Sequence, residues 1–357
     1  MERLRRIGGH LAALPASSAA VELPPVLTLG EGTVSAASGK LGLLRESTMG
    51  LGGEELRRRM ELDGYLLIRG LIPSNILREA YAAARGVLES EGTWPGGKFS
   101  ASWRSCEPVM RALEAPPLRR ACETLFWGEA AASFPFKWVR TSQPGQATDF
   151  HVDNVYMNRG SNRLITAWVP LEDVPFEKSP LCLLERSHSL PGFELFRQTY
   201  TEHDWQDSKI IGNGGLYSKD PWEMLAMDEN ARLVPFPFPP PANRSCAHLL
   251  HPPVHNCCRW LTSEFRLGDA LLLGMKTVHG AVKNTSAETR LSFDVRWQPL
   301  NDLWDDRYVS GGNSSWPGVD FVVGADAAKI DLAVLPPDTD EGSLTLSEMK
   351  DEWGLPH

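Results

Sequence analysis

The stretch GDALLLGMKTVHGAVKNTSAETRLSFDVR, residues 268–296, predicts two strands joined by turns. Residues 270–273 form a continuous apolar run after the turn at Gly268-Asp269, which is typical of a strand covered on both faces. The second strand, expected at 290–298, alternates instead. Its apolar face contains Leu291, Phe293 and Val295, and its polar face contains Arg290, Ser292, Asp294 and Arg296. A buried polar face is costly unless it lines a site, so we expect this face to be functional.

Short strands separated by turns precede this stretch and predict a mostly β fold with flanking helices. The strands are expected at 65–69, 136–141, 150–157, 164–169, 181–184, 270–273 and 290–298, and the helices at 53–62, 74–91, 107–114, 118–126 and 345–353. Short, evenly punctuated strands favour a sandwich or jelly roll over βαβ units. The predicted organisation is an N-terminal arm at 1–45, a main domain at 46–315 and a C-terminal tail at 316–357 with a short helix. A long loop insertion at 191–262 interrupts the main domain.

The composition is that of a globular protein and limits the possible partners. The 357 residues are 42% hydrophobic and 23% charged, and Lys+Arg 36 against Asp+Glu 45 gives a formal net charge of -9. This acidic balance argues against a nucleic-acid binder, which needs a basic face. No apolar run reaches the length of a membrane-spanning helix, so no membrane span is expected. The oligomeric state stays open between monomer and homodimer.

The cysteines and the N-terminal residues bear on location. The six cysteines are scattered without the spacing of a disulfide framework, which favours a reducing, intracellular compartment. Arg3-Leu4, five residues and then His10-Leu11 resemble a type 2 peroxisomal targeting signal. A frayed basic N-terminus would have the same composition. The predicted location is therefore intracellular, either cytoplasmic or peroxisomal.

A metal site is predicted at His151-Val152-Asp153, which falls in the strand expected at 150–157. Side chains two residues apart on a strand share a face, so the imidazole and the carboxylate project together. His279, after the strand at 270–273, supplies a second imidazole. Two nitrogen ligands and one carboxylate with open positions suit a non-haem Fe(II) oxygenase. His-x-Asp alone is a weak signal, and its weight comes from Arg290, whose planar fork matches a carboxylate bidentately.

Several motifs stand in a fixed order along the chain. They are GYLLIRG at 64–70, His151-Val152-Asp153, AWVPLEDV at 167–174, Ser187-His188-Ser189, Gly268-Asp269, His279-Gly280 and Arg290-Leu291-Ser292. In this order the stretch from about Gly64 to Tyr308 resembles the phytanoyl-CoA dioxygenase family of Fe(II)/2-oxoglutarate-dependent oxygenases. The separation of His279 from Arg290, 290 − 279 = 11 positions, also follows the family pattern. Two residues depart from it: Val152 stands where Gln is common, and Arg186 where Gly usually precedes Ser-His.

The resemblance implies a double-stranded β-helix core, which is a jelly roll of the cupin-like kind. It implies Fe(II), 2-oxoglutarate and O2 as cofactors, with His151, Asp153 and His279 as the catalytic iron ligands. It also implies a cosubstrate site in which Arg290 clamps the distal carboxylate of 2-oxoglutarate, Ser292 assists and Trp168 packs alongside. Halogenases of this chemistry replace the ligand carboxylate by a small residue, so Asp153 argues against halogenation.

Residues beyond this set are expected to line a substrate cavity. They are Trp103, Trp138, Met157 and Arg296. Continued alternation along the strand would place Met157 on the metal-facing side and Tyr156 away from it. A separate group of His and Cys at 248–258 is dense enough to bind zinc. Pro252-Pro253 interrupts any helical arrangement there, and a surface loop is the simpler interpretation.

The predicted function is that of an Fe(II)/2-oxoglutarate-dependent dioxygenase acting on a small molecule. It would hydroxylate a C–H bond, or oxidise it by desaturation or cyclisation, with release of succinate and CO2. A substrate from secondary metabolism is favoured because no basic cluster for the phosphates of CoA stands out. The alternatives are a peroxisomal acyl-CoA 2-hydroxylase, a metal-dependent cupin enzyme without 2-oxoglutarate, and a non-catalytic cupin-like binding protein.

Overall fold

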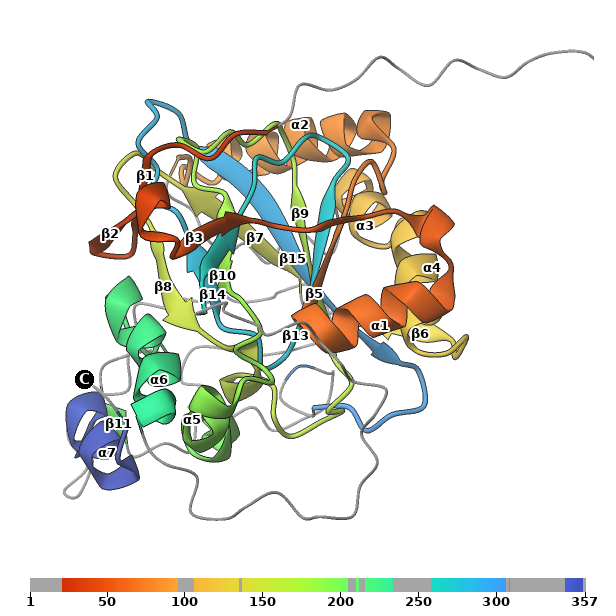
Figure 1. Cartoon of the computed structure of the whole chain (residues 1–357). Helices are drawn as coiled ribbons and strands as arrows, with labels where there is room; N and C mark the ends of the chain where they lie inside the picture. The colour runs from red at the N-terminus through yellow and green to blue at the C-terminus, as the bar shows by residue number, and fades with distance from the viewer. Residues whose placement is uncertain are drawn as a thin grey trace, which may run out of the picture.

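The structure is a computed structural model that describes residues 21–95, 106–134, 137–204, 210–211, 216–233, 258–305, 308 and 344–355. Two β-sheets form its centre, and a layer of helices lies beside the larger one (Figure 1). This agrees with the expected combination of sheets and flanking helices. The prediction of one long loop at 191–262 is wrong, because this stretch contains the helices Glu194–Gln198 and Pro221–Leu233 and the strand Trp260–Thr262. The fold matters here for how it places the polar face of one long strand.

The larger sheet has the order β4-β5-β13-β9-β15-β6, and β7 also pairs with β15. Its strands are β4 (Glu46–Ser47), β5 (Tyr65–Ile68), β6 (Ala131–Ser133), β7 (Trp138–Ser142), β9 (Ile165–Pro170), β13 (Ala270–Gly274) and β15 (Arg290–Pro299). The apolar run predicted at 270–273 is β13, which pairs antiparallel with β5 on one side and β9 on the other. A strand in the middle of a sheet that is covered on both faces is apolar throughout.

The smaller sheet has the order β3-β12-β10-β14-β8. Its strands are β3 (Leu41–Leu43), β8 (Thr148–His151), β10 (Leu181–Leu184), β12 (Trp260–Thr262) and β14 (His279–Ala281). Two further pairs stand apart: β1 (Val26–Leu29) with β2 (Gly32–Ser35), and β11 (Ile210–Ile211) with β16 (Leu344–Thr345). We expected no strand before residue 53, yet β3 pairs in parallel with β12. Three residues are too few to show a period, which is why the pattern missed it.

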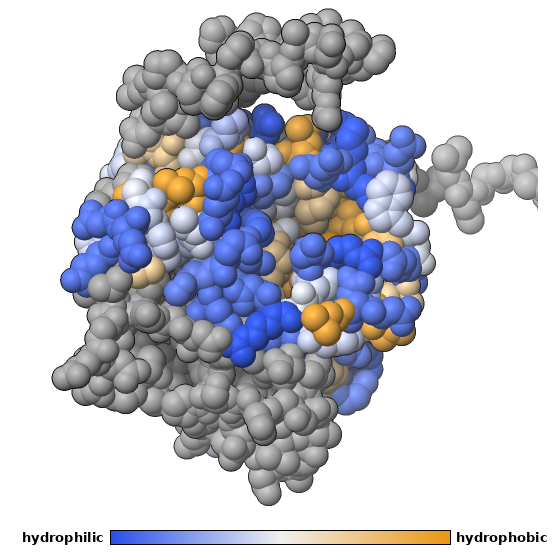
Figure 2. All heavy atoms as spheres, turned by 90° about the horizontal axis from the view of Figure 1, so that it is seen from below, coloured by the Kyte–Doolittle hydropathy of each residue, from blue (hydrophilic) through white to orange (hydrophobic). Residues whose placement is uncertain are grey.

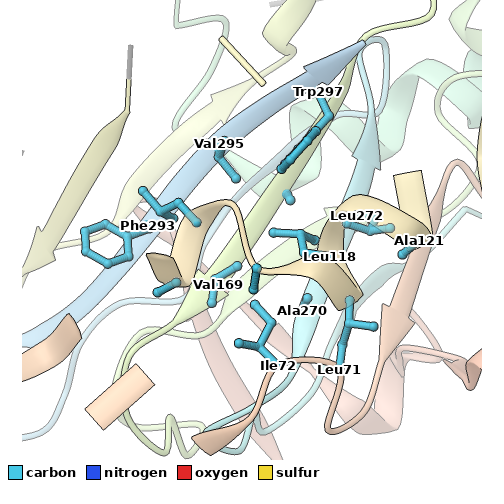
Figure 3. Close-up of a cluster of buried hydrophobic side chains, with 14 of the residues drawn as sticks. Leu71, Ile72, Leu118, Ala121, Val169, Ala270, Leu272, Phe293, Val295 and Trp297 are labelled. Carbon is cyan, nitrogen blue, oxygen red and sulfur yellow. The ribbon is translucent and has the colours of Figure 1, made fainter. Parts of the chain in front are cut away.

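In the described part of the chain, four α-helices cover the outer face of the larger sheet, and three more lie near the smaller one (Figure 1). The helices are α1 (Gly53–Asp63), α2 (Ser74–Ser90), α3 (Glu107–Leu113), α4 (Pro116–Leu125), α5 (Glu194–Gln198), α6 (Pro221–Leu233) and α7 (Leu346–Trp353). Figure 3 shows Leu118 of α4 beside Leu272 of β13, in the same buried cluster as Phe293 and Val295 of β15. The apolar face predicted for β15 therefore meets the helices, and its polar face is turned the other way.

A second apolar cluster joins the two sheets. It includes Leu67, Trp168 and Leu271 of the larger sheet with Leu183, Leu261 and Ala281 of the smaller sheet. The sheets therefore pack face to face, and the polar face of β15 is directed into the space between them.

No helix in the described part of the chain is long and apolar enough to cross a bilayer. On the face seen in Figure 2, hydrophilic residues surround small, separate hydrophobic patches. Isolated apolar groups of this kind are ordinary on a protein surface and identify no binding surface.

Candidate metal centre

Two neighbouring strands bring the two predicted histidine ligands together. His151 is the last residue of β8 and is the direct partner of His279, the first residue of β14. Their ring centroids are 4.3 Å apart. Asp153 completes the group, and one potential ligand atom from each of the three buried side chains lies within 4.8 Å of the others.

The strand predicted at 150–157 ends earlier than expected. β8 stops at His151, and Asp153 begins a short 3-10 helix, Asp153–Val155. Val152 between them is extended, with φ -123° and ψ 146°. The side chains of His151 and Asp153 therefore share a side as predicted, but the alternation stops at Asp153.

Each histidine is oriented by a backbone carbonyl. Nδ1 of His151 lies 2.8 Å from the carbonyl oxygen of Asp149, and Nδ1 of His279 lies 3.0 Å from that of Thr277. A proton on Nδ1 leaves Nε2 as the free lone pair, which is the usual arrangement of a histidine ligand. Burial, together with the neighbouring His279, lowers the pKa of His151 to about 3. A neutral imidazole is the form that binds a metal, so this donor set fits Fe(II).

The Asp153 carboxylate is held by two residues from the larger sheet. Nη2 of Arg296 lies 2.8 Å from Oδ1, and the Thr166 hydroxyl donates to Oδ2. Burial acts to raise the pKa of Asp153, but Arg296, followed by the two histidines, outweighs it and holds the pKa below its usual value. The carboxylate is therefore ionised at neutral pH.

The three residues predicted to bind the cosubstrate also meet. Cζ of Arg290 lies 5.4 Å from the centroid of the Trp168 ring, whose Nε1 donates to Oγ of Ser292 at 3.1 Å. Burial lowers the pKa of Arg290 to about 10, so the guanidinium stays charged at neutral pH. Nη1 donates to the carbonyl of Ser179, but the buried Nε has no hydrogen-bond partner among the described residues. A buried donor without an acceptor, on a charged group, fits an anionic ligand.

Both departures from the family pattern have a structural account. Arg186, which stands where Gly is usual, has a φ of 55°, in the left-handed region that favours glycine. Val152, which stands where Gln is common, is fully buried in the apolar cluster on the outer side of the smaller sheet. Its side chain therefore points away from His151 and Asp153.

The residues expected to line a substrate cavity have different placements. Trp138 packs on Arg296, with Cζ 4.2 Å from its ring centroid, and is thereby close to Asp153. Met157 is buried in a cluster with Phe134, Leu164, Met275 and Tyr308. The expectation that Tyr156 points away from the metal is wrong: its ring centroid lies 5.9 Å from that of His151. The strand ends before Tyr156, so alternation no longer applies.

Other predicted features lie wholly or partly outside the described residues. They are Trp103, the targeting match at 3–11 and most of the His and Cys group at 248–258. Cys258 of that group is buried, and its Sγ lies 3.3 Å from the carbonyl oxygen of Glu185. Sequence reasoning missed Thr166 altogether. It stands two residues before Trp168 on β9, so alternation would have placed it on the same face.

Part of the sequence matches a known protein family. The sequence profile described as phytanoyl-CoA dioxygenase (PhyH) matches residues 60–292. No curated protein is significantly similar to the chain.

Among solved structures, the non-heme alpha-ketoglutarate-dependent epimerase SnoN from nogalamycin biosynthesis is 18% identical, with a TM-score of 0.48. The match covers 78% of this chain and 92% of the SnoN chain. The carbocyclase SnoK from nogalamycin biosynthesis is also 18% identical, with a TM-score of 0.48, covering 73% of this chain and 89% of its own. The non-heme monooxygenase ThoJ is 14% identical, with a TM-score of 0.46, covering 81% of this chain and 85% of its own. These likenesses are too distant to assign a reaction.

Proposed function

The chain belongs to the phytanoyl-CoA dioxygenase family, and on that basis we propose that it is a dioxygenase dependent on Fe(II) and 2-oxoglutarate. The reaction we propose is oxidation of a C–H bond in a small organic molecule by hydroxylation, desaturation or ring closure. Fe(II), 2-oxoglutarate and O2 are the cofactors of the family. Succinate and CO2 would be the products of the cosubstrate.

One observation carries the proposal: the convergence of the buried groups of His151, Asp153 and His279 within 4.8 Å. These are two nitrogen donors and one anionic oxygen donor. Three ligands leave open positions on a six-coordinate iron, which is the arrangement of non-haem oxygenases. The presence of the carboxylate Asp153 favours C–H oxidation over halogenation.

The cosubstrate site we propose is at the Arg290 end of β15. Arg290 would bind the distal carboxylate of 2-oxoglutarate, Ser292 would assist, and Trp168 would pack beside it. The buried Nε of Arg290, which has no hydrogen-bond partner among the described residues, supports this role. A guanidinium can hold a carboxylate through two parallel hydrogen bonds, which fixes both the position and the orientation of the ligand.

When bound, the iron and 2-oxoglutarate supply the oxidising chemistry, and the protein positions the groups and excludes water. The aromatic residues beside the ligands support the second task. The ring of Tyr156 contacts that of His151, and Trp138 covers the guanidinium of Arg296. Tyr308 in turn contacts Trp138, with ring centroids 5.9 Å apart. A wall of this kind suits a small, largely apolar substrate such as those of secondary metabolism, with Trp138, Met157 and Arg296 near it.

We propose that the two sheets are the two halves of a double-stranded β-helix. Their face-to-face packing supports this, as does the antiparallel pairing of β8 with β14 and of β9 with β13 and β15. In this arrangement the smaller sheet would carry the histidine ligands. The larger sheet would carry Arg290.

The test is anaerobic addition of Fe(II) and 2-oxoglutarate to the purified full chain. We expect a weak visible charge-transfer band and, after admission of air, slow release of succinate even without the substrate. His151→Ala should lose both, with succinate release falling more than about 100-fold, because residues that only support the ligands already contribute 10- to 100-fold.

A matched control is His203→Ala, since the His203 ring contacts Trp353 rather than the three ligands. This variant should keep the charge-transfer band and the wild-type rate of succinate release. Release of succinate by His151→Ala at the wild-type rate would refute the proposed function.

A further inference from the structure

The Asp153 carboxylate is fixed at both of its oxygen atoms by β15 and β9. Arg296 donates to Oδ1 from 2.8 Å, and Thr166 donates to Oδ2. All three side chains are at least nine-tenths buried. A carboxylate with only one of these contacts can turn about its last side-chain bond. With both, Asp153 has a single orientation.

Arg296 makes few other polar contacts that would explain its burial. Its Nε and Nη1 have no hydrogen-bond partner among the described residues. The second nearby carboxylate, Asp294, lies 3.7 Å from Nη1, and it accepts a hydrogen bond from Arg140 at 2.7 Å. Trp138 packs on the guanidinium from 4.2 Å and restricts its movement. A buried charge is costly without a close counter-charge, so the contact with Asp153 is the one that compensates for it.

We propose that Arg296 is a positioning residue for the carboxylate that binds iron, backed by Trp138 and assisted by Thr166. The inference rests on the proposed function, because it takes Asp153 as a metal ligand. Arg296 fixes the carboxylate so that it presents one oxygen to the metal beside His151 and His279. Removal of the guanidinium leaves a buried carboxylate that is free to rotate and has lost its counter-charge. Supporting residues of this kind contribute roughly 10- to 100-fold to metal affinity.

The experiment is an anaerobic titration of the full chain with Co(II), followed by its visible d–d absorption. We expect Arg296→Met to raise the Kd for Co(II) roughly 10- to 100-fold and to change the shape of the d–d bands. Arg296→Lys keeps the charge without the planar fork and should give an intermediate Kd. Thr166→Val removes one hydrogen bond and should raise the Kd about 5-fold.

The matched control is Arg140→Met. Arg140 also donates to a buried carboxylate on β15, from 2.7 Å, but that carboxylate is Asp294. The Kd of the Arg140→Met variant for Co(II) should stay within about threefold of the wild-type value. The thermal unfolding midpoints of the metal-free variants show whether each variant is folded. If Arg296→Met does not fold, Arg296→Lys and Thr166→Val decide the outcome.

A Co(II) Kd and spectrum of Arg296→Met that match the wild type would overturn the inference alone, because the wild-type metal site would be intact. Equal weakening in Arg140→Met would overturn it too, since charge alone would then account for the loss. Failure of the wild type to bind Co(II) would overturn the proposed function together with this inference. The two failures are therefore distinguishable.

Discussion

The two ends of the polar face of β15 each hold a buried arginine, and the two arginines differ in what they bind. Arg290 and Arg296 lie on the same face of one strand, and each guanidinium packs on a tryptophan, Trp168 or Trp138. Arg296 has Asp153 within 2.8 Å. Arg290 donates to a backbone carbonyl of Ser179 and has no carboxylate within ion-pair distance in the described part of the chain.

The difference separates two uses of the same residue type. A buried guanidinium with an internal carboxylate is already compensated and can hold that carboxylate in place. One without a carboxylate needs an anion from outside, since its charge is otherwise uncompensated. The Arg290 end is thus suited to a ligand and the Arg296 end to a metal-binding side chain.

The largest effect is expected at the Arg290 end. At saturating Co(II), Arg290→Met should weaken 2-oxoglutarate binding at least about 30-fold, because truncating one partner of a buried, hydrogen-bonded charge pair costs about 2–5 kcal/mol. Binding can be followed by tryptophan fluorescence, since Trp168 lies beside the site. Arg140→Met is the control, and a comparable loss of affinity there would remove the distinction between the ends.

The Arg296 end should respond to acid. Burial lowers the pKa of His151 to about 3. Below pH 6.5, His151 is therefore protonated in the unfolded chain but stays neutral in the folded chain. The free energy of unfolding of the metal-free protein should therefore decrease as the pH is lowered. His151 alone should account for a decrease of about 2 kcal/mol between pH 6.5 and pH 5. Urea unfolding at both pH values measures this. Burial also lowers the pKa of His188 and His203, which act in the same direction.

The contribution of His151 to this loss of stability is measured by comparing the wild type with His151→Gln. The variant should lose about 2 kcal/mol less over the same interval. Parallel pH profiles of the two proteins would show that His151 titrates normally in the folded chain.

The smallest effect concerns the tryptophans. Trp168→Phe keeps an aromatic ring beside Arg290 but removes the Nε1 hydrogen bond to Ser292. One hydrogen bond contributes about 1 kcal/mol, so 2-oxoglutarate binding should weaken about 5-fold. Trp138 packs on Arg296 instead, so Trp138→Phe should leave the affinity for 2-oxoglutarate unchanged. A larger effect from Trp138→Phe than from Trp168→Phe would contradict the assignment of the ends.

Local periodicity predicted the two faces of β15 because a long strand repeats its pattern several times. It put Leu291 and Phe293 on one apolar face, and in the structure that face packs against the helices. It also put His151 and Asp153 on one side, since Val152 is extended. The prediction that Tyr156 points away from the metal site was wrong, because nothing in the local pattern marks the change from β8 to a 3-10 helix.

Contacts between distant parts of the chain could not be predicted in this way. Arg296 and Asp153 are 143 positions apart, and their ion pair depends on how the strands are ordered in space. The sequence offered Arg296 only as a residue expected to line a substrate cavity. The family resemblance supplied the ligand set, but it did not include the groups that hold Asp153. Thr166 and Arg296 became visible as its partners only in the folded structure.

The place of β13 between β5 and β9 has a consequence for synthesis of the chain on the ribosome. Leu67 of β5 pairs with Leu271 of β13, 271 − 67 = 204 positions later. At about 5–20 residues per second, β5 waits roughly 10–40 s for its partner. Until then α1–α4 have no completed sheet to cover, and their apolar faces are available to chaperones. Nascent chains arrested before residue 270 should therefore be digested readily by protease, and chains extended past β15 should resist it.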